Sequence, residues 1–137
     1  MNAMWTYGVA AGRMSRQKFV DVCCTAAAKL NGIYPQKGTI AVGSDGDIVV
    51  FDPNYHNTIS VESNPTGLAY NVFEGLEQIG QAETVLLRGN VVVENGKYTG
   101  ELKDIVVDGV TYHGCAGGQG KFVPGKPYGS GYDLLKK

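Results

Sequence analysis

The 137-residue sequence lacks the features that mark several large classes of protein. It has no run of Lys or Arg, and its 12 basic and 13 acidic residues leave a formal net charge of −1. This balance excludes a protein that binds nucleic acid through electrostatic attraction to phosphates. The uncharged apolar stretches are far shorter than the ~18–20 residues of a membrane span. Residues 1–4 carry neither the basic nor the apolar region of a signal peptide. The sequence therefore predicts a soluble cytoplasmic protein with no membrane or nucleic-acid partner.

Cysteine and histidine are also scarce. Of the three cysteines, Cys23 and Cys24 are adjacent in a helical pattern and Cys115 lies in a Gly-rich stretch. Without CxxC spacing they form neither a disulfide framework nor a zinc site, and we interpret them as small packing residues and a loop thiol. The two histidines, His56 and His113, fall in separate predicted loops without HxH or HExxH spacing. Because a hydrolytic zinc site needs about three protein ligands, we predict that neither histidine binds a metal.

Other catalytic patterns are missing too. There is no GxSxG turn, and the Gly-rich residues 114–120 lack the GK[ST] ending of a phosphate-binding loop. Asp45, Asp47 and Asp52 could suggest a calcium site, but a turn and a strand end are where Asp hydrogen-bonds its own backbone. We therefore predict no catalytic, cofactor-binding or metal-binding residue and no cofactor in this chain.

The sequence does contain one clear helix and many turns. Twenty glycines and eight tyrosines are typical of a turn-rich, largely β protein, and the length suits a single domain. Ser15 can cap a helix that ends at Asn31-Gly32. One face of this helix is apolar and consists of Phe19, Cys23, Ala26, Ala27 and Leu30.

After residue 37 the pattern predicts short strands. Asp-Gly and Asn-Gly turns between apolar runs indicate hairpins. Three hairpins are predicted: 39–42 with 48–51 around residues 43–47, 83–88 with 91–94 around Gly89-Asn90, and 105–107 with 110–112 around Asp108-Gly109. Two further strands are predicted, 58–61 after a break at Asp52-Pro53-Asn54, and 97–99 after a turn at Asn95-Gly96.

From Gly114 the composition changes to Gly, Pro and Lys. Such a stretch is either disordered or an arm that lies on another surface. We favour the arm because Tyr128, Tyr132, Leu134 and Leu135 offer apolar surface to bury.

Several segments resemble the dihydropyrimidinase and hydantoinase branch of the amidohydrolase superfamily. Residues 37–52 (KGTIAVGSDGDIVVFD) resemble a hairpin of the C-terminal β-sandwich in that superfamily. The other matching segments, in the same order as in that branch, are 12–35, 70–75 (YNVFEG), 85–93 (VLLRGNVVV) and 118–123 (GQGKFV). The resemblance runs from about Trp5 to about Tyr128 and so covers nearly the whole chain.

This resemblance implies a piece of a cyclic-amide hydrolase without its active site. Such enzymes are several times longer and hydrolyse dihydropyrimidines or hydantoins with two zinc ions in a (β/α)₈ barrel. Their metal ligands and catalytic Asp all precede the matched region. The implied fold is mainly β with one or two helices: the last barrel helix region (1–36), the C-terminal part of the composite β-sandwich (37–100), and a C-terminal hairpin and Gly/Pro-rich arm (101–137), without the barrel itself.

Two functions remain open at this point. The chain is either the non-catalytic C-terminal part of such a hydrolase or a stand-alone β-sandwich that assembles with itself or with a longer relative. A small-molecule binding domain has only the Tyr/Gly-rich tail in its favour. Because the strands that complete the sandwich in the family are absent, we expect a homo-oligomer that covers the free sheet edge, the helix stripe and the arm.

Overall fold

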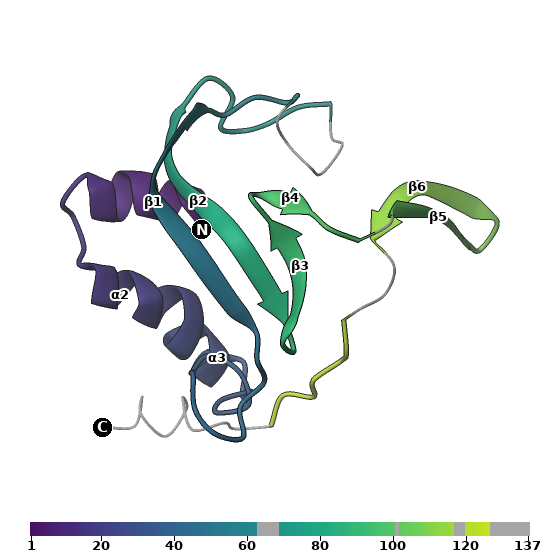
Figure 1. Cartoon of the computed structure of the whole chain (residues 1–137), viewed down its shortest axis with the longest axis horizontal. Helices are drawn as coiled ribbons and strands as arrows, with labels where there is room; N and C mark the ends of the chain where they lie inside the picture. Colours follow the sequence, from purple (N-terminus) through teal and green to yellow (C-terminus); the bar gives the residue numbers. More distant parts are fainter. Residues whose placement is uncertain (63–68, 101, 117–119, 127–137) are drawn as a thin grey trace.

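The computed structural model describes residues 1–62, 69–100, 102–116 and 120–126. It is mainly β, with two helices against one side of an open antiparallel sheet, as expected from the sequence (Figure 1). The first helix is α1 (Asn2–Met4), continued by a π-helical turn over Trp5–Ala10. The second comprises α2 (Arg16–Val20), a π-helical segment Asp21–Thr25 and α3 (Ala26–Leu30).

The strands form two sheets in the described part of the chain. Strands β1 (Ile48–Thr58), β2 (Glu77–Leu87), β3 (Asn90–Glu94) and β4 (Lys97–Tyr98) follow one another in an antiparallel sheet. Strands β5 (Leu102–Val107) and β6 (Val110–Ala116) pair separately as a hairpin beyond β4 (Figure 1). The long β1 therefore has a strand partner on one side only among the described residues.

The second helix begins as predicted but buries a different face. The Ser15 hydroxyl caps it by accepting a hydrogen bond from the Lys18 N–H at 3.1 Å. Phe19 is buried, whereas Ala26 and Leu30 are exposed, Leu30 by 80%. A π-helical turn holds about one residue more than an α-helical turn, so the segment at 21–25 shifts the buried face by one position. Ala28 is buried in consequence.

The core is an aromatic cluster between the helices and the sheet. The ring of Trp5 lies 5.2 Å from that of Phe19 and 4.8 Å from that of Phe51 on β1, as measured between centroids. The sequence analysis did not identify the helix that carries Trp5. Its buried Thr6 hydroxyl accepts a hydrogen bond from the Ile79 N–H of β2 at 2.9 Å, which fixes this helix to the sheet.

The predicted hairpin of residues 39–42 with 48–51 is wrong. Residues 39–42 form no strand, and Ile40 and Val42 are highly exposed, Val42 fully. Strand 48–51 is part of β1, but its partner is β2. The 36–47 loop is instead closed by the Asp45 N–H, which donates to the Gln36 carbonyl at 2.9 Å. Without another strand beside them, the apolar residues 40–42 remain exposed to solvent.

The predicted break at Asp52-Pro53-Asn54 is also wrong. Strand β1 continues through it to Thr58, with register shifts against β2 after Val50 and Asp52. Pro53 is tolerated because an edge strand at a bulge does not need every N–H. The separate strand predicted at 58–61 is accordingly only the end of β1.

The remaining hairpins are confirmed. β2 and β3 pair around Arg88-Gly89, one residue earlier than predicted, with positive φ at both positions. Asn95-Gly96 turns β3 into β4, and Asp108-Gly109 joins β5 to β6. β6 extends to Ala116, into the stretch expected to belong to the arm. Tyr128, Tyr132, Leu134 and Leu135, the expected anchors of that arm, lie outside the described residues.

The described part of the chain exposes many large hydrophobic side chains. Leu30, Ile40 and Val42 are each at least 80% exposed. Among the described residues, the buried hydrophobic side chains are Trp5, Phe19 and Ala28. The helices and sheet thus leave apolar surface that their own packing does not cover.

Candidate functional site

The carboxylates singled out in the sequence have structural partners. Lys37 Nζ lies 2.7 Å from Asp45 Oδ2 and also pairs with Asp47. Asp47 additionally accepts a hydrogen bond from the Arg88 N–H at 2.8 Å, which ties the 36–47 loop to the β2–β3 turn. Asp52 lies within β1 at a register shift rather than at a strand end, but it makes the expected local bond and accepts a hydrogen bond from the Asn54 N–H at 2.9 Å.

The charges of this loop shift its pKa values in the direction that favours the ion pairs. The hydrogen bond from Lys37 lowers the pKa of Asp45. Partial burial would raise the pKa of Asp47, but hydrogen bonds from Lys37 and from the Arg88 N–H outweigh it and lower the pKa. Hydrogen bonds to Asp45 and then Asp47 raise the pKa of Lys37. Lys37, Asp45 and Asp47 are therefore charged at neutral pH, and their ion pairs hold the two ends of the loop together.

Neither histidine lies in the loop predicted for it. His56 is exposed on β1, and its Nδ1 lies 3.6 Å from Glu77 Oε1 on β2. His113 lies within β6, and its side chain is outside the described part. Both predicted loops are strands because β1 and β6 are longer than the apolar runs that indicated them.

The adjacent cysteines lie on the second helix. The sulfurs of Cys23 and Met4 are 4.0 Å apart, so Cys23 packs against the first helix. Burial, and then the neighbouring Cys23, raise the pKa of the Cys24 thiol. A thiol with a raised pKa is a poor nucleophile at neutral pH. The side chain of Cys115 lies outside the described residues.

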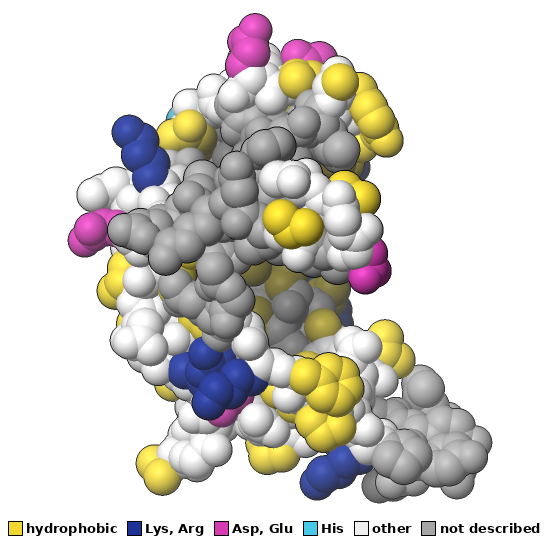
Figure 2. Space-filling view, turned by 90° about the vertical axis from the view of Figure 1, so that its right-hand side faces the viewer, with side chains coloured by type: hydrophobic (Ala, Val, Ile, Leu, Met, Phe, Trp, Pro, Cys, Tyr) yellow, Lys and Arg dark blue, Asp and Glu magenta, His cyan; other side chains and the backbone are white. Residues whose placement is uncertain are grey.

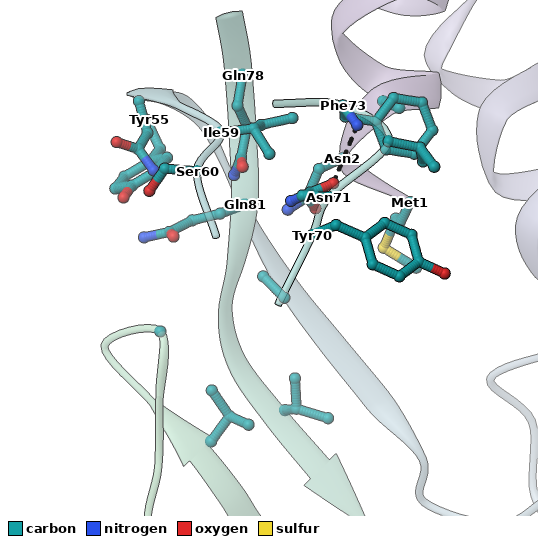
Figure 3. Close-up of a pocket in the computed structure, with 17 residues that line it drawn as sticks. Met1, Asn2, Tyr55, Ile59, Ser60, Tyr70, Asn71, Phe73, Gln78 and Gln81 are labelled. Carbon is teal, nitrogen blue, oxygen red and sulfur yellow. Dashed lines mark hydrogen bonds between the residues drawn. The ribbon is translucent and has the colours of Figure 1, made fainter. Parts of the chain in front are cut away.

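A hollow of about 870 Å³ lies over β1 and β2 (Figure 3). Its wall is formed by the chain start, the two strands and the segment that follows β1. The residues that line it are Met1, Asn2, Ala3, Tyr55, Asn57, Ile59, Ser60, Tyr70, Asn71, Val72, Phe73, Gln78, Gln81, Ala82, Val85, Val93 and Gly96. The Asn71 carboxamide accepts a hydrogen bond from the Phe73 N–H at 3.0 Å and shapes one rim (Figure 3).

The chemistry of this hollow is that of a contact surface. None of its lining residues is acidic, basic or a histidine. Amide side chains such as Gln78 and Gln81 line it together with aromatic rings, so its side chains offer hydrogen bonds and apolar contact but carry no charge. The face shown in Figure 2 is also hollowed near its centre, with hydrophobic side chains in its floor. Such a surface suits a neutral polypeptide segment better than an ionic substrate.

Sequence reasoning did not find this hollow. Residues 70–75 were noted only as part of a resemblance, and Tyr55 and Gln78 belong to strands whose lengths were underestimated. The signal that could have found it was a long β1, which the Asp-Pro-Asn sequence concealed.

The sequence matches the model of the amidohydrolase family over residues 1–92. The chain belongs to the amidohydrolase family. It is 36% identical over its full length to a dihydropyrimidinase of Dictyostelium discoideum, of which it spans 24%. It is 42% identical over 101 residues to a D-hydantoinase of Geobacillus stearothermophilus, covering 74% of this chain and 21% of that enzyme.

Solved structures of hydantoinases are similar to this chain as well. A D-hydantoinase from Thermus sp. superposes with a TM-score of 0.70 at 51% identity, covering 73% of this chain and 22% of that one. The chain thus spans between a fifth and a quarter of these relatives. Its likeness to them is a likeness to one part of a much larger enzyme.

The described residues do not fit the metal centre of such an enzyme. They contain no group of three or more His, Cys, Asp or Glu side chains that could hold a metal ion. The carboxylates of Asp45 and Asp47 both pair with the Lys37 ammonium. Within the same residues, no helix is long and apolar enough to cross a membrane.

Proposed function

We propose that this chain is the C-terminal β-sandwich part of a cyclic-amide hydrolase of the dihydropyrimidinase and hydantoinase kind, and that by itself it does not catalyse hydrolysis. The observation that carries the proposal is identity of 36–51% to enzymes of that name, confined to a fifth or a quarter of their length. In this division residues 1–36 are the last barrel-type helix region, 37–100 the sandwich, and 101–137 the hairpin and arm. The reaction, the two zinc ions and the substrate belong to the parent enzyme.

The exposed surface supports this assignment. The rest of the enzyme would meet the hollow over β1 and β2, the edge of β1 that has no partner among the described strands, and the exposed side chains of Ile40 and Val42. We further assign the protein to the cytoplasm, on its composition.

The first test is hydrolysis of dihydrouracil and hydantoin by the purified chain with added zinc. We expect no turnover above the metal blank, because the described residues hold no ligand cluster. Turnover above that blank would overturn the non-catalytic assignment.

The second test is complementation. The Geobacillus D-hydantoinase is produced without the segment that this chain matches, and either that segment or this chain is added back. We expect both to restore hydrolysis. Restoration by the enzyme's own segment but not by this chain would refute the assignment.

A second function, a stand-alone module that assembles with itself, is favoured by the same exposed apolar surface. Its partner would be another copy of the chain rather than the rest of an enzyme. A chain that forms a stable oligomer but fails to complement would support this function instead.

A further inference from the structure

The described part of the C-terminal region returns to the end of the second helix. We call residues 120–126 the C-terminal strap. The strap runs below the sheet towards α3 (Figure 1). There the Lys126 N–H donates a hydrogen bond to the Gly32 carbonyl at 3.1 Å. A segment far away in the sequence thus meets the helix end through main-chain atoms.

Glycines on both sides make this approach possible. A Cβ added at Gly32 would lie 2.6 Å from the Lys126 carbonyl oxygen and 2.9 Å from the Lys126 nitrogen. A Cβ added at Gly125 would lie 2.6 Å from the Asn31 carbonyl oxygen. A Cβ atom does not approach another heavy atom this closely in real structures. The obstructing atoms belong to the backbone, so they cannot move aside as the end of a flexible side chain could. Any other residue at either position would separate the two segments.

The strap's side chains bury little. Phe122 is 91% exposed, Lys121 and Pro124 are exposed, and Val123 is half-buried. The strap is therefore attached more by its backbone and by Gly125 than by apolar burial. The large apolar residues expected to hold the arm lie outside the described residues.

The helix end provides the complementary chemistry. The carbonyls of Ala27, Ala28 and Lys29 at the helix end already accept hydrogen bonds from the N–H groups of residues 31–33, and the acceptor that the strap uses is the Gly32 carbonyl just beyond the helix. Gly32, with φ of +67°, turns the chain out of the helix and presents its carbonyl to the strap. The positive charge of Lys126 suits the negative end of the helix dipole.

We propose that Asn31-Gly32 is a docking site for an extended, glycine-containing segment, and that the protein's own C-terminal strap occupies it as a detachable latch. The pair Gly32 and Gly125 decides whether the strap is bound. This inference goes beyond the proposed function and does not depend on any catalytic activity.

The test uses the full chain with Gly32→Ala and, separately, Gly125→Ala. Release of the strap opens the bond after Lys121 to trypsin and the Lys126 amide to hydrogen exchange. We expect both variants to be cleaved at Lys121 about tenfold faster than the wild type, because cleavage follows the population of the open form. The Lys126 amide loses its protection in both.

Two matched variants serve as controls. Gly43→Ala also places a side chain at positive φ (+89°) but meets nothing within 4 Å. Gly120→Ala lies in the strap itself, again in open space. Both should be cleaved at the wild-type rate. Because Gly125 is not part of the helix, its variant separates loss of docking from damage to the helix end.

The proposal is overturned if Gly125→Ala is cleaved no faster than Gly120→Ala, or if Lys126 exchanges freely in the wild type. Faster cleavage in Gly32→Ala alone would also overturn it, because that result reports only a disturbed helix end.

Discussion

At the scale of single residues, the packing depends on positions where a side chain is absent. Gly80 is buried in the middle of β2 with φ of +78°. A Cβ there would lie 2.5 Å from Phe51 Cε1 and 2.8 Å from Trp5 Cδ1. The aromatic cluster therefore occupies the space that a side chain at this position would need.

We predict that Gly80→Ala lowers the free energy of unfolding by about 3 kcal/mol. Two costs add: an alanine in the left-handed backbone conformation, and overpacking of its methyl group against the aromatic cluster. Gly75→Ala is the matched control, because Gly75 has the same φ of +78° but nothing within 4 Å. It should cost about 1 kcal/mol, from the backbone alone. Urea unfolding of the three proteins measures both values, and equal losses in the two variants would contradict the packing argument.

At the scale of elements, the 36–47 loop is stabilised by ion pairs rather than by strand pairing. Its apolar residues 39–42 have no neighbouring strand, yet Lys37, Asp45 and Asp47 hold its two ends together and Arg88 fixes it to the β2–β3 turn. The pKa shifts set the pH range of this stabilisation. The lowered pKa values of the aspartates make it present above about pH 4 and lost as the pH falls through the folded-state pKa values. Because the pKa of Lys37 is raised, this stabilisation persists at high pH until the pH rises through the folded-state pKa of Lys37, above about 10.

We predict that Asp47→Asn lowers the free energy of unfolding at pH 7 by about 1 kcal/mol, since the pair is partly exposed and screened. The amide oxygen can still accept from the Arg88 N–H, so the variant isolates the charge. The difference from wild type should shrink below about pH 4, where the wild-type carboxylates also become neutral.

The control for this prediction is Asp21→Asn. Asp21 pairs with Lys18 at 3.0 Å on an exposed helix face, where ion pairs contribute little. Urea unfolding at several pH values measures both variants. A loss for Asp47→Asn that stays constant down to pH 3 would show that the charge is not its cause.

At the scale of the whole molecule, the exposed apolar surface predicts association. The second helix covers only one side of the sheet, and β1 has a free edge among the described strands. The hollow over β1 and β2 is lined by no charged side chain. Unpaired edges and exposed apolar patches promote pairing with another chain.

We predict that the purified chain sediments as a dimer or a larger oligomer, and that the species shifts towards monomer when Ile40→Lys and Val42→Lys are combined. Both side chains are almost fully exposed, so the substitution should not disturb the fold. A single monomeric species over a wide concentration range would show that the chain needs no partner to cover these surfaces.

The sequence by itself determined the local features whose physics lies within a few residues. Ser15 specifies the helix start because its hydroxyl reaches an N–H three residues on. The Asn-Gly and Asp-Gly turns specify their hairpins because these residues accept positive φ. The motifs shared with hydantoinases also pointed to the amidohydrolase family without any structure.

Only the tertiary structure decided what depends on distant partners. Residues 39–42 carry a strand pattern but form a loop, because β2 rather than this segment lies beside residues 48–51. A π-helical segment moves the buried face of the second helix by one position, which the apolar spacing alone does not reveal. The close approach of Gly32 to Lys126 and of Gly125 to Asn31 depends on two glycines that look like ordinary turn residues in sequence. Strand pairing and close backbone approach are set by long-range packing, and no local pattern encodes which segments will meet.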